Sequence, residues 1–279
     1  MSNKNLVQTT TDEKGREIVM VRVDKTLEEL MKEKPTSRWS PAYWHPSFDY
    51  LNDLFTKTEA KSILEIEGEN AVIAGDHVRP SRGEKKGFNL KTGIEYYETA
   101  GFLESGYNYS EIKECSNNAY ERLKETAVKK YDILISVAGV GGVGKARSCL
   151  IVNEPAKKSC TGDVFSIRLK KINPIYLYIL LKSKIGKDQI LKMKNGVSTE
   201  NLNTKEALAI KVPKISDKSE KNIVVEFHKI ISFHDKAMEA KKNNQEAEYK
   251  KNIEIADKML KDLIAKTEAA IRGERKDVI

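Results

Sequence analysis

The stretch that most constrains the fold of this chain lies near its C-terminus and contains neither proline nor glycine. From Ser219 to Ile271, Glu, Lys and Ala dominate, and apolar residues recur at intervals of four and three, as they do in coiled coils. The apolar residues of this stripe are Ile223, Phe227, Ile230, Ile253, Ala256, Leu260 and Leu263. We therefore predict a long α-helix over residues 217–273, followed by a short tail over 274–279.

A helix of this length needs a partner helix. At a rise of about 1.5 Å per residue, about fifty residues would form a rod of roughly 75 Å. Such a rod cannot bury its apolar stripe against one small domain, so we expect a coiled coil with another helix, from the same chain or from a second copy. We assign the seven stripe residues to dimerisation. The polar centre, "EAKKNNQEAEYKK", indicates a bend or a change of partner.

The rest of the chain divides into a small N-terminal element and one large domain. Residues 1–37 suggest a β-hairpin, formed by "NLVQTT" and "EIVMVRV", and a short helix that begins near Thr26 and ends before Pro35. Residues 38–216 alternate strand-like runs ("AVIAG", "DVFSIRL", "LAIKVP") with two helical pieces, near "SNNAYERLKE" and in "INPIYLYILLKSKIGKDQILKM". We therefore predict an α+β protein: a mixed α/β domain followed by a long C-terminal α-helix that forms a coiled coil.

Residues 131–146, "YDILISVAGVGGVGKA", contain two nucleotide-binding patterns at once. The glycines of residues 139–145 fit the dinucleotide fingerprint G-x-G-x-x-G and, with Lys145, most of a phosphate-binding P-loop. Both patterns require a helix to begin at the last glycine, whereas a β-rich run, "SCLIV", follows here. Ala146 also lacks the hydroxyl that a P-loop uses to bind Mg²⁺. We therefore interpret the stretch as two strands joined by a glycine-rich turn.

Basic residues are concentrated in the middle of the chain. The whole sequence has 49 Lys and Arg against 41 Asp and Glu, a net charge of +8. Residues 157–194 hold ten basic and two acidic residues, and residues 79–93 hold five basic and one acidic. Either run alone is equally well explained as a solvated surface, but two runs in one domain favour binding to nucleic acid.

No catalytic or metal-binding pattern stands out. The cysteines are widely spaced, which favours reduced thiols and speaks against a zinc site; they are Cys115, Cys149 and Cys160. We interpret the four histidines as surface or packing residues; they are His45, His77, His228 and His234. No apolar run approaches the roughly 18 residues that span a membrane, and the polar N-terminus does not resemble a secretory signal. The sequence thus predicts a cytoplasmic protein.

Several segments, taken in order, resemble the target-recognition region of the specificity (S) subunits of type I restriction–modification systems. "RWSPAYWHPSFDYL" is similar to the start of that region, and "KKYDILISVAGVGGVGKA" to its "GDILIS" strand and glycine-rich turn. "TGIEYYETAGFLESGYN" is similar to the segment in which a glycine leads a strand into an Asn-rich or Gly-rich loop. "YLYILLKSKIGKDQILKMKNGVSTENLNTKEALAIKVP" resembles its helix, small-polar turn and closing strand. A long helix directly afterwards is also the family's arrangement. The resemblance covers residues 38–271.

The chain departs from the family's pattern in two places. The usual "GD" before the "ILIS" strand is "YD" here, at Tyr131 and Asp132. An S subunit usually carries two recognition domains and two long helices, whereas this chain has length for one of each. It therefore resembles a half-subunit, and the resemblance gives no role to the N-terminal hairpin.

The resemblance implies a non-catalytic, sequence-specific DNA-recognition subunit that directs a partner methyltransferase to a bipartite site on double-stranded DNA. S-adenosylmethionine would be bound by that methyltransferase, and no cofactor by this chain. Self-association through the C-terminal helix would place two recognition domains at a fixed separation. Whether a restriction subunit joins the complex, and whether the chain pairs with itself or with a different half-subunit, stay open.

DNA contacts are expected from the basic runs and from the polar residues of the turns. Backbone phosphates set the register and base edges set the specificity. Candidates for phosphate contacts are Arg79, Arg82, Lys85, Lys86, Lys145, Arg147 and Lys194. Candidates for base contacts are Tyr96, Tyr97, Asn195, Thr199 and Asn201. The alternatives are strand packing for the tyrosines and a helix C-cap for Asn195.

Two other classes of function are compatible with the sequence. One is a non-catalytic coiled-coil scaffold with a basic domain that binds nucleic acid without sequence preference. The other is a nucleotide-binding enzyme that uses residues 139–145, against which Ala146 and the missing helix speak.

Overall fold

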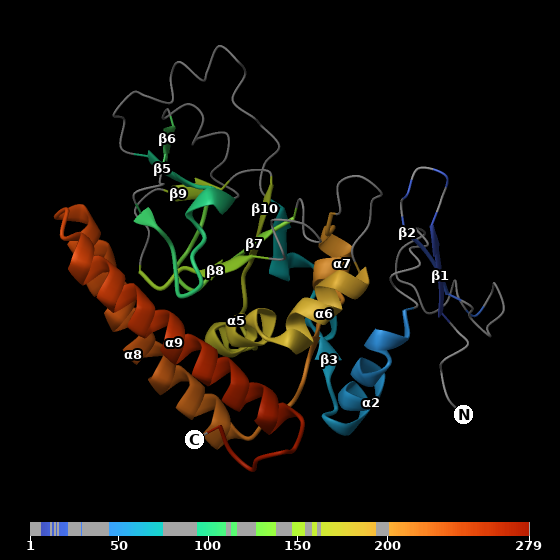
Figure 1. Ribbon diagram of the computed structural model, residues 1–279. Coiled ribbons are helices and arrows are strands. Elements are labelled where there is room, and N and C mark those ends of the chain that lie inside the picture. The colour runs from blue at the N-terminus through green and yellow to red at the C-terminus, as the bar shows by residue number, and fades with distance from the viewer. Residues whose placement is uncertain are drawn as a thin grey trace.

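The computed structural model describes residues 45–74, 94–109, 113–115, 127–137, 147–153, 158–160, 163–193 and 201–278, and near the N-terminus 7–11, 17–21 and residues 13, 15 and 29. Within these ranges a mixed α/β domain precedes two long C-terminal helices (Figure 1). The predicted fold class is therefore confirmed. None of the described helices is both long and apolar enough to cross a membrane.

A four-stranded antiparallel sheet forms the centre of the domain. Its strands are β4 (Val72–Ala74), β10 (Val164–Ile167), β7 (Ile133–Ser136) and β8 (Ser148–Leu150), in the order β4-β10-β7-β8. All four residues of β7 and of β10 are buried, because both faces of this sheet are covered. Continuous apolar runs of this kind are typical of strands buried on both sides.

Strands β7 and β8 pair in antiparallel register, with Ile133 opposite Leu150 and Ile135 opposite Ser148. The prediction of two strands around residues 138–146 is therefore confirmed. The chain resumes as a strand at Ser148, and no helix begins there to bind a phosphate group. This observation removes the structural basis for a nucleotide site in the glycine-rich stretch.

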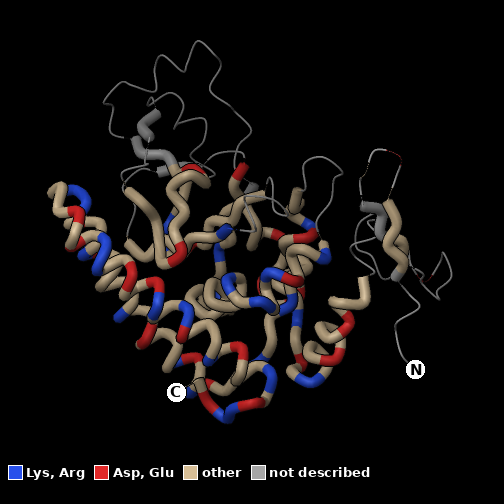
Figure 2. The backbone as a smooth tube through the Cα atoms, viewed as in Figure 1, with Lys and Arg blue, Asp and Glu red and all other residues tan. Residues whose placement is uncertain are grey.

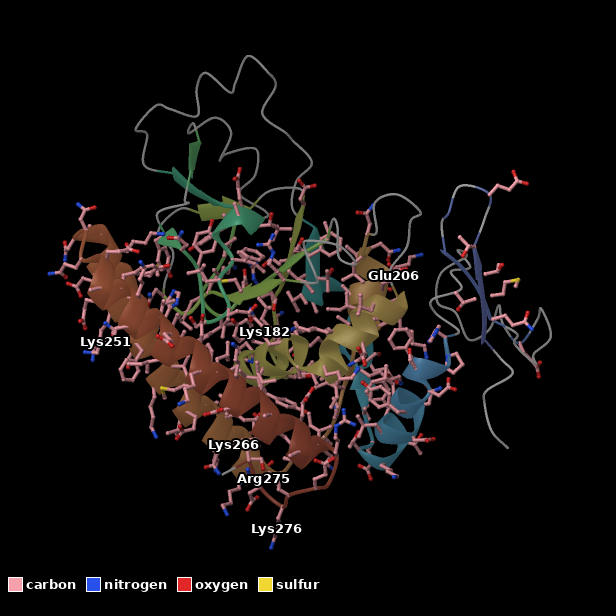
Figure 3. All side chains as sticks on the ribbon, in the orientation of Figure 1. Lys182, Glu206, Lys251, Lys266, Arg275 and Lys276 are labelled. Carbon is pink, nitrogen blue, oxygen red and sulfur yellow. The ribbon has the colours of Figure 1, made fainter. Side chains whose placement is uncertain are left out.

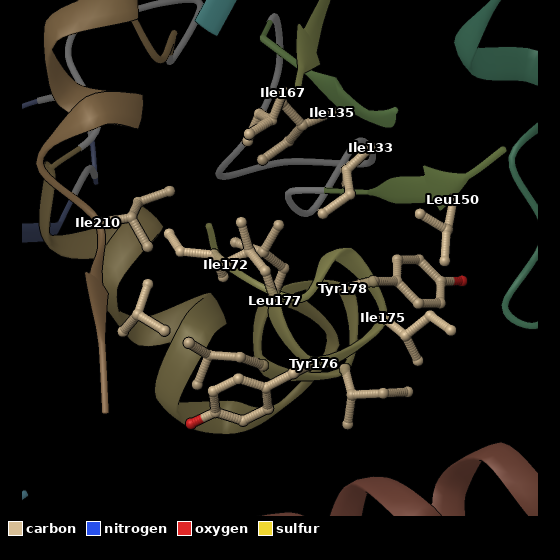
Figure 4. Close-up of a cluster of buried hydrophobic side chains, with 14 of the residues drawn as sticks. Ile133, Ile135, Leu150, Ile167, Ile172, Ile175, Tyr176, Leu177, Tyr178 and Ile210 are labelled. Atoms are coloured by element: carbon tan, nitrogen blue, oxygen red, sulfur yellow. The ribbon is translucent and has the colours of Figure 1, made fainter. Parts of the chain in front are cut away.

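Helix α5 (Pro174–Lys182) covers one face of the sheet and α6 (Lys184–Met193) extends it. The Asn173 side chain caps α5, and Pro174 occupies the first turn, where a missing N–H costs nothing. Leu177 of α5 is buried in one cluster with Ile133, Ile135 and other sheet residues (Figure 4). The helix predicted to start near Pro174 is thus present, interrupted only at Ser183, which caps the end of α5.

Short elements pack beside these helices. They are η3 (Pro46–Phe48), α2 (Tyr50–Lys57), β3 (Lys61–Ser62), α3 (Ile63–Glu67), η4 (Glu69–Ala71), α7 (Thr204–Leu208) and β11 (Lys211–Val212). β11 pairs with β3 in a two-stranded antiparallel sheet. The run "LAIKVP" was predicted as one strand, but only Lys211–Val212 is strand and Leu208 belongs to α7. The reason is a capping box between Asn203 and Glu206 that starts a helical turn there.

The opposite face of the central sheet meets a second, smaller layer. This layer holds η6 (Thr99–Gly101) and the three-stranded sheet of β6 (Lys113–Cys115), β5 (Ile94–Tyr97) and β9 (Lys158–Cys160), in the order β6-β5-β9. Tyr97, Phe102 and Tyr107 from this layer pack with Leu134 and Cys149 of the central sheet. Adjacent residues of β7 therefore point into two different cores.

The C-terminal region is a helical hairpin, which corrects the prediction of one helix over 217–273. Helix α8 (Asp217–Lys242) ends, residues 243–245 turn, and α9 (Glu246–Ile271) runs back along it (Figure 1). Asn244 has φ of 56°, a left-handed conformation that no helix interior contains. The polar centre of the sequence is therefore a bend.

Figure 2 shows Lys and Arg interspersed with Asp and Glu along both helices.

The apolar stripe of this hairpin is buried within one chain. Of its seven residues only Ile253 is partly exposed, and the other six are buried. The Phe227 ring lies edge-on to the Tyr178 ring of α5, 5.6 Å between centroids, and the Glu268 carboxylate accepts hydrogen bonds from the first two N–H groups of α6. These residues thus hold α8 and α9 to each other and to the domain, which corrects their assignment to dimerisation. Self-association itself stays a prediction.

The expected N-terminal hairpin is also present. Strands β1 (Val7–Thr11) and β2 (Glu17–Val21) pair in antiparallel register, from Val7 opposite Val21 to Thr11 opposite Glu17. The short helix predicted after Thr26 falls, apart from Glu29, outside the described residues, as does the helix predicted near "SNNAYERLKE".

Candidate nucleic-acid interface

Three segments that were predicted to contact DNA start or end at one edge of the central sheet. β4 and β7 both run antiparallel to β10, with Ala74 opposite Phe165 and Ser136 opposite Val164. The last residues of β4 and β7 and the first residues of β8 and β10 therefore lie at the same edge. Ala74 directly precedes residues 75–93, and residues 138–146 are flanked by Val137 and Arg147.

Backbone hydrogen bonds join the third segment to this edge. The Leu202 N–H donates to the Val137 carbonyl at 2.9 Å, which places Asn201, the residue after 194–200, beside the end of β7. The Ser136 N–H donates to the Arg147 carbonyl at 2.9 Å, and the Val137 N–H donates to the Asp163 carbonyl at 3.0 Å. Positions about sixty residues apart in the sequence are thus held within a few ångströms of each other. We call this set, Ala74, Val137, Arg147, Asp163 and Asn201, the loop edge.

Arg147 is the basic residue of the loop edge. Its side chain is half-buried, and its Nε is shielded from solvent and has no hydrogen-bond partner among the described residues. A buried N–H group with no acceptor costs roughly 1–3 kcal/mol. The side chain as a whole is only half-buried, so its guanidinium group can still meet a phosphate oxygen, the usual acceptor for arginine at DNA interfaces.

Two further polar side chains lie at the loop edge. Asn201 is exposed, as a residue that contacts DNA must be. Asp163 is also exposed and directly precedes β10. Asp163 is not among the residues predicted to contact DNA, because basic runs point to cations and not to an isolated acidic residue. An acidic side chain at an interface with DNA can accept a hydrogen bond from cytosine N4.

Most of the other predicted contact residues lie outside the described residues. These are Arg79, Arg82, Lys85, Lys86, Lys145, Lys194, Asn195 and Thr199. Tyr96 lies in β5, opposite Lys113 of β6 and Ser159 of β9, and its side chain is also outside the description. The structure therefore fixes where their segments attach to the fold, and their individual contacts stay predictions.

Tyr97 was predicted to read bases, and this prediction is wrong. Its side chain is 1% exposed and meets the Tyr107 ring edge-on, with 4.8 Å between centroids. The ring is part of the core between the two sheets. The alternative considered for the tyrosines, strand packing, is the correct one at this position.

A buried ion pair supports the start of β7. The Asp132 carboxylate accepts hydrogen bonds from Arg168 Nε at 2.9 Å and Nη2 at 2.7 Å, and from the Lys129 N–H at 2.8 Å. Asp132 is 1% exposed, so a bidentate arginine is the partner that its buried charge needs. Tyr131, just before it, has φ of 66°.

Helix α8 is fastened to the segment that follows β5. His234 is buried; its Nε2 lies 3.1 Å from the Tyr107 carbonyl and its Nδ1 lies 3.2 Å from Ser105 Oγ. Lys182 of α5 donates to the Leu103 carbonyl at 3.3 Å. Burial lowers the pKa of both His234 and Lys182. The histidine is therefore a packing residue, as predicted, and it joins the helical hairpin to the segment after η6.

The histidines and cysteines form no catalytic arrangement in the described part of the chain. His45 caps η3 and His228 is exposed, whereas His77 lies outside the description. Burial raises the pKa of the Cys149 thiol to about 12, which disfavours the nucleophilic thiolate form. Among the described residues, no group of three His, Cys, Asp or Glu side chains could hold a metal ion.

Comparison with known proteins adds a relationship by sequence. No family model matches the chain. Over 159 residues the chain is 24% identical to the EcoBI specificity subunit of a type I restriction enzyme from Escherichia coli. The resemblance to type I specificity subunits is confirmed. The match takes in 57% of this chain and 32% of that relative, so the chain spans about a third of the length of the specificity subunit it matches.

Solved structures show weaker likeness. The type IIG restriction endonuclease BpuSI is 11% identical, with 88% of this chain and 35% of that chain covered and a TM-score of 0.48. The type I S subunit from M. genitalium is 14% identical, with 66% and 40% covered and a TM-score of 0.41. A chain of a type I restriction–modification system is 14% identical, with 89% and 51% covered and a TM-score of 0.44.

Proposed function

We propose that this chain is the DNA-recognition subunit of a type I restriction–modification complex and that its loop edge faces the DNA. The observation that carries the proposal is that described residues adjoining the segments 75–93, 138–146 and 194–200 meet at the loop edge. These segments contain eight of the twelve residues predicted to contact DNA. The similarity to a type I specificity subunit supports the same function.

The subunit would act without catalysing a reaction itself. In this proposal a partner methyltransferase binds S-adenosylmethionine and methylates the DNA, with or without a restriction subunit, and the chain supplies the target sequence. Two copies joined through the outer faces of their helical hairpins would read two half-sites separated by a spacer. The stripe inside the hairpin is already buried, so any such pairing uses other residues of α8 and α9.

Replacement of Arg147 by alanine tests the proposal. We expect Arg147→Ala to weaken binding to duplex DNA several-fold, because a phosphate contact is lost. The slope of log K against log salt concentration should fall by about 0.9, the value for one phosphate contact. The measurement is fluorescence anisotropy with a labelled duplex pool of random sequence, titrated at several salt concentrations.

The matched control is Arg275→Ala, which removes the same charge elsewhere. Arg275 lies in the turn after α9, where its Nε donates to the Asp277 carbonyl (Figure 3). Affinity and salt slope of this variant should equal those of the unaltered chain. Equal losses in both variants would indicate attraction by net charge alone, which is the behaviour of a scaffold with non-specific binding, and would contradict the proposal.

A further inference from the structure

An apolar groove lies on the domain between α2, α3, α6 and α7. Its volume is about 820 Å³. Leu51, Val72, Met193 and Leu208 are buried side chains that line it. Leu64 of α3 also lines it and is 44% exposed, one of three large apolar side chains that are exposed in the described part of the chain. An apolar surface of this kind is a frequent site of protein–protein contact.

The buried polar side chains along this groove are already paired within the chain. Ser62 exchanges hydrogen bonds with Glu65 in the capping box of α3. The Gln189 side chain donates to the Lys211 carbonyl at 3.1 Å and accepts from the Lys211 N–H at 2.7 Å, as a neighbouring strand would. Small-molecule sites usually present a few polar groups that fix the ligand's orientation. Here these two are engaged, so recognition would rest on apolar contact and charge.

The charge around the groove is positive. Three lysines line it, Lys192, Lys205 and Lys211, against one glutamate, Glu69. The nearby Glu65 carboxylate is held by the Ser62 N–H and hydroxyl, hydrogen bonds that lower its pKa. Positive potential around an apolar floor favours an occupant that has carboxylates beside apolar side chains. DNA fits poorly, because its backbone offers no apolar group to cover such a floor.

We propose that this groove docks an acidic segment of a protein partner, with the partner's apolar side chains on the floor and its carboxylates opposite the lysines. Anchors of this kind are the usual means by which an amphipathic segment binds a groove. The inference rests on the groove alone and does not depend on the function proposed above.

Site-specific photo-crosslinking in cells tests the inference on the full-length chain. A photo-reactive phenylalanine analogue replaces Leu64, whose exposure lets the larger side chain fit without disturbing the core. A control chain carries the same analogue at Val225 of α8, which is 55% exposed and remote in sequence from the groove. We expect the analogue at position 64 to crosslink to one partner peptide that has a net negative charge and apolar residues. The analogue at position 225 should not crosslink to that peptide.

A charge reversal then separates docking from chance proximity. Lys205→Glu, combined with the analogue at position 64, should reduce the crosslink at least tenfold. Glu should be tolerated there, because Lys205 is the second residue of α7, near the helix N-terminus, and a neighbouring position already holds Glu206. Lys266→Glu on α9, which makes the same charge change far from the groove in sequence, should leave the yield unchanged. The inference would be overturned by a crosslink to nucleic acid, to another copy of this chain or to a peptide without net negative charge. It would also be overturned if no crosslink formed or if Lys205→Glu left the yield unchanged.

Discussion

Tyr131 adopts a backbone conformation that suits glycine. Its φ of 66° lies in the left-handed region, where a residue with a Cβ pays roughly 1–2 kcal/mol. The turn around it is held by the Tyr131 N–H, which donates to the Ile151 carbonyl at 2.6 Å, and by the Asp132 carboxylate. The type I specificity subunits that the sequence resembles usually have glycine before this aspartate. In this chain, tyrosine therefore occupies a left-handed position that glycine would adopt without strain.

We predict that Tyr131→Gly gives a more stable protein than Tyr131→Ala, by about 1 kcal/mol. Both variants lose the ring, which lies 5.2 Å from Lys130 Nζ, but only glycine relieves the left-handed strain. Chemical denaturation of both variants measures the difference. At Lys130, which has no positive φ, the order should reverse and Ala should be the more stable. The same order at both positions would mean that the turn is formed differently.

At the scale of elements, local sequence patterns predicted the helices and strand pairs that form between residues close together in the sequence. The pairing of β7 with β8 followed from two β-rich runs around a glycine-rich turn, and α5 followed from an apolar run after Pro174. The sequence predicted one long helix instead of the hairpin of α8 and α9. A heptad pattern shows which face of a helix is buried, but it does not show which other helix covers that face. The polar residues 243–245 were the available signal of a bend.

Asn244 distinguishes the hairpin from a continuous helix. In the hairpin, Asn244 has φ of 56°, so Asn244→Gly should be at least as stable as Asn244→Ala. In a continuous helix, alanine would be favoured over glycine by about 1 kcal/mol. Thermal unfolding of the two variants, with sedimentation to verify equal mass, gives the sign of the difference. Lys251, exposed within α9 (Figure 3), is the control position where alanine should be the more stable.

At the scale of the whole molecule, long-range contacts gather the candidate site. Leu202 meets Val137 through a hydrogen bond that spans 65 residues, and β4 joins β10 across about ninety. No local pattern encodes these pairings, so the sequence identified Arg147 and Asn201 separately and could not show that both of their segments meet the end of β7. It also could not show that Tyr97 points into the core between the two sheets. Long-range pairing thus brings the residues of the loop edge together from distant parts of the sequence.

The central claim, that this chain selects the DNA sequence for a partner methyltransferase, is tested most directly by mapping methylated bases. Single-molecule sequencing would compare the source strain with the gene intact, deleted and restored. We predict that one motif, made of two half-sites around a spacer, loses its methylation on deletion and regains it on restoration. A genome in which every methylated motif is unchanged by the deletion would contradict the claim.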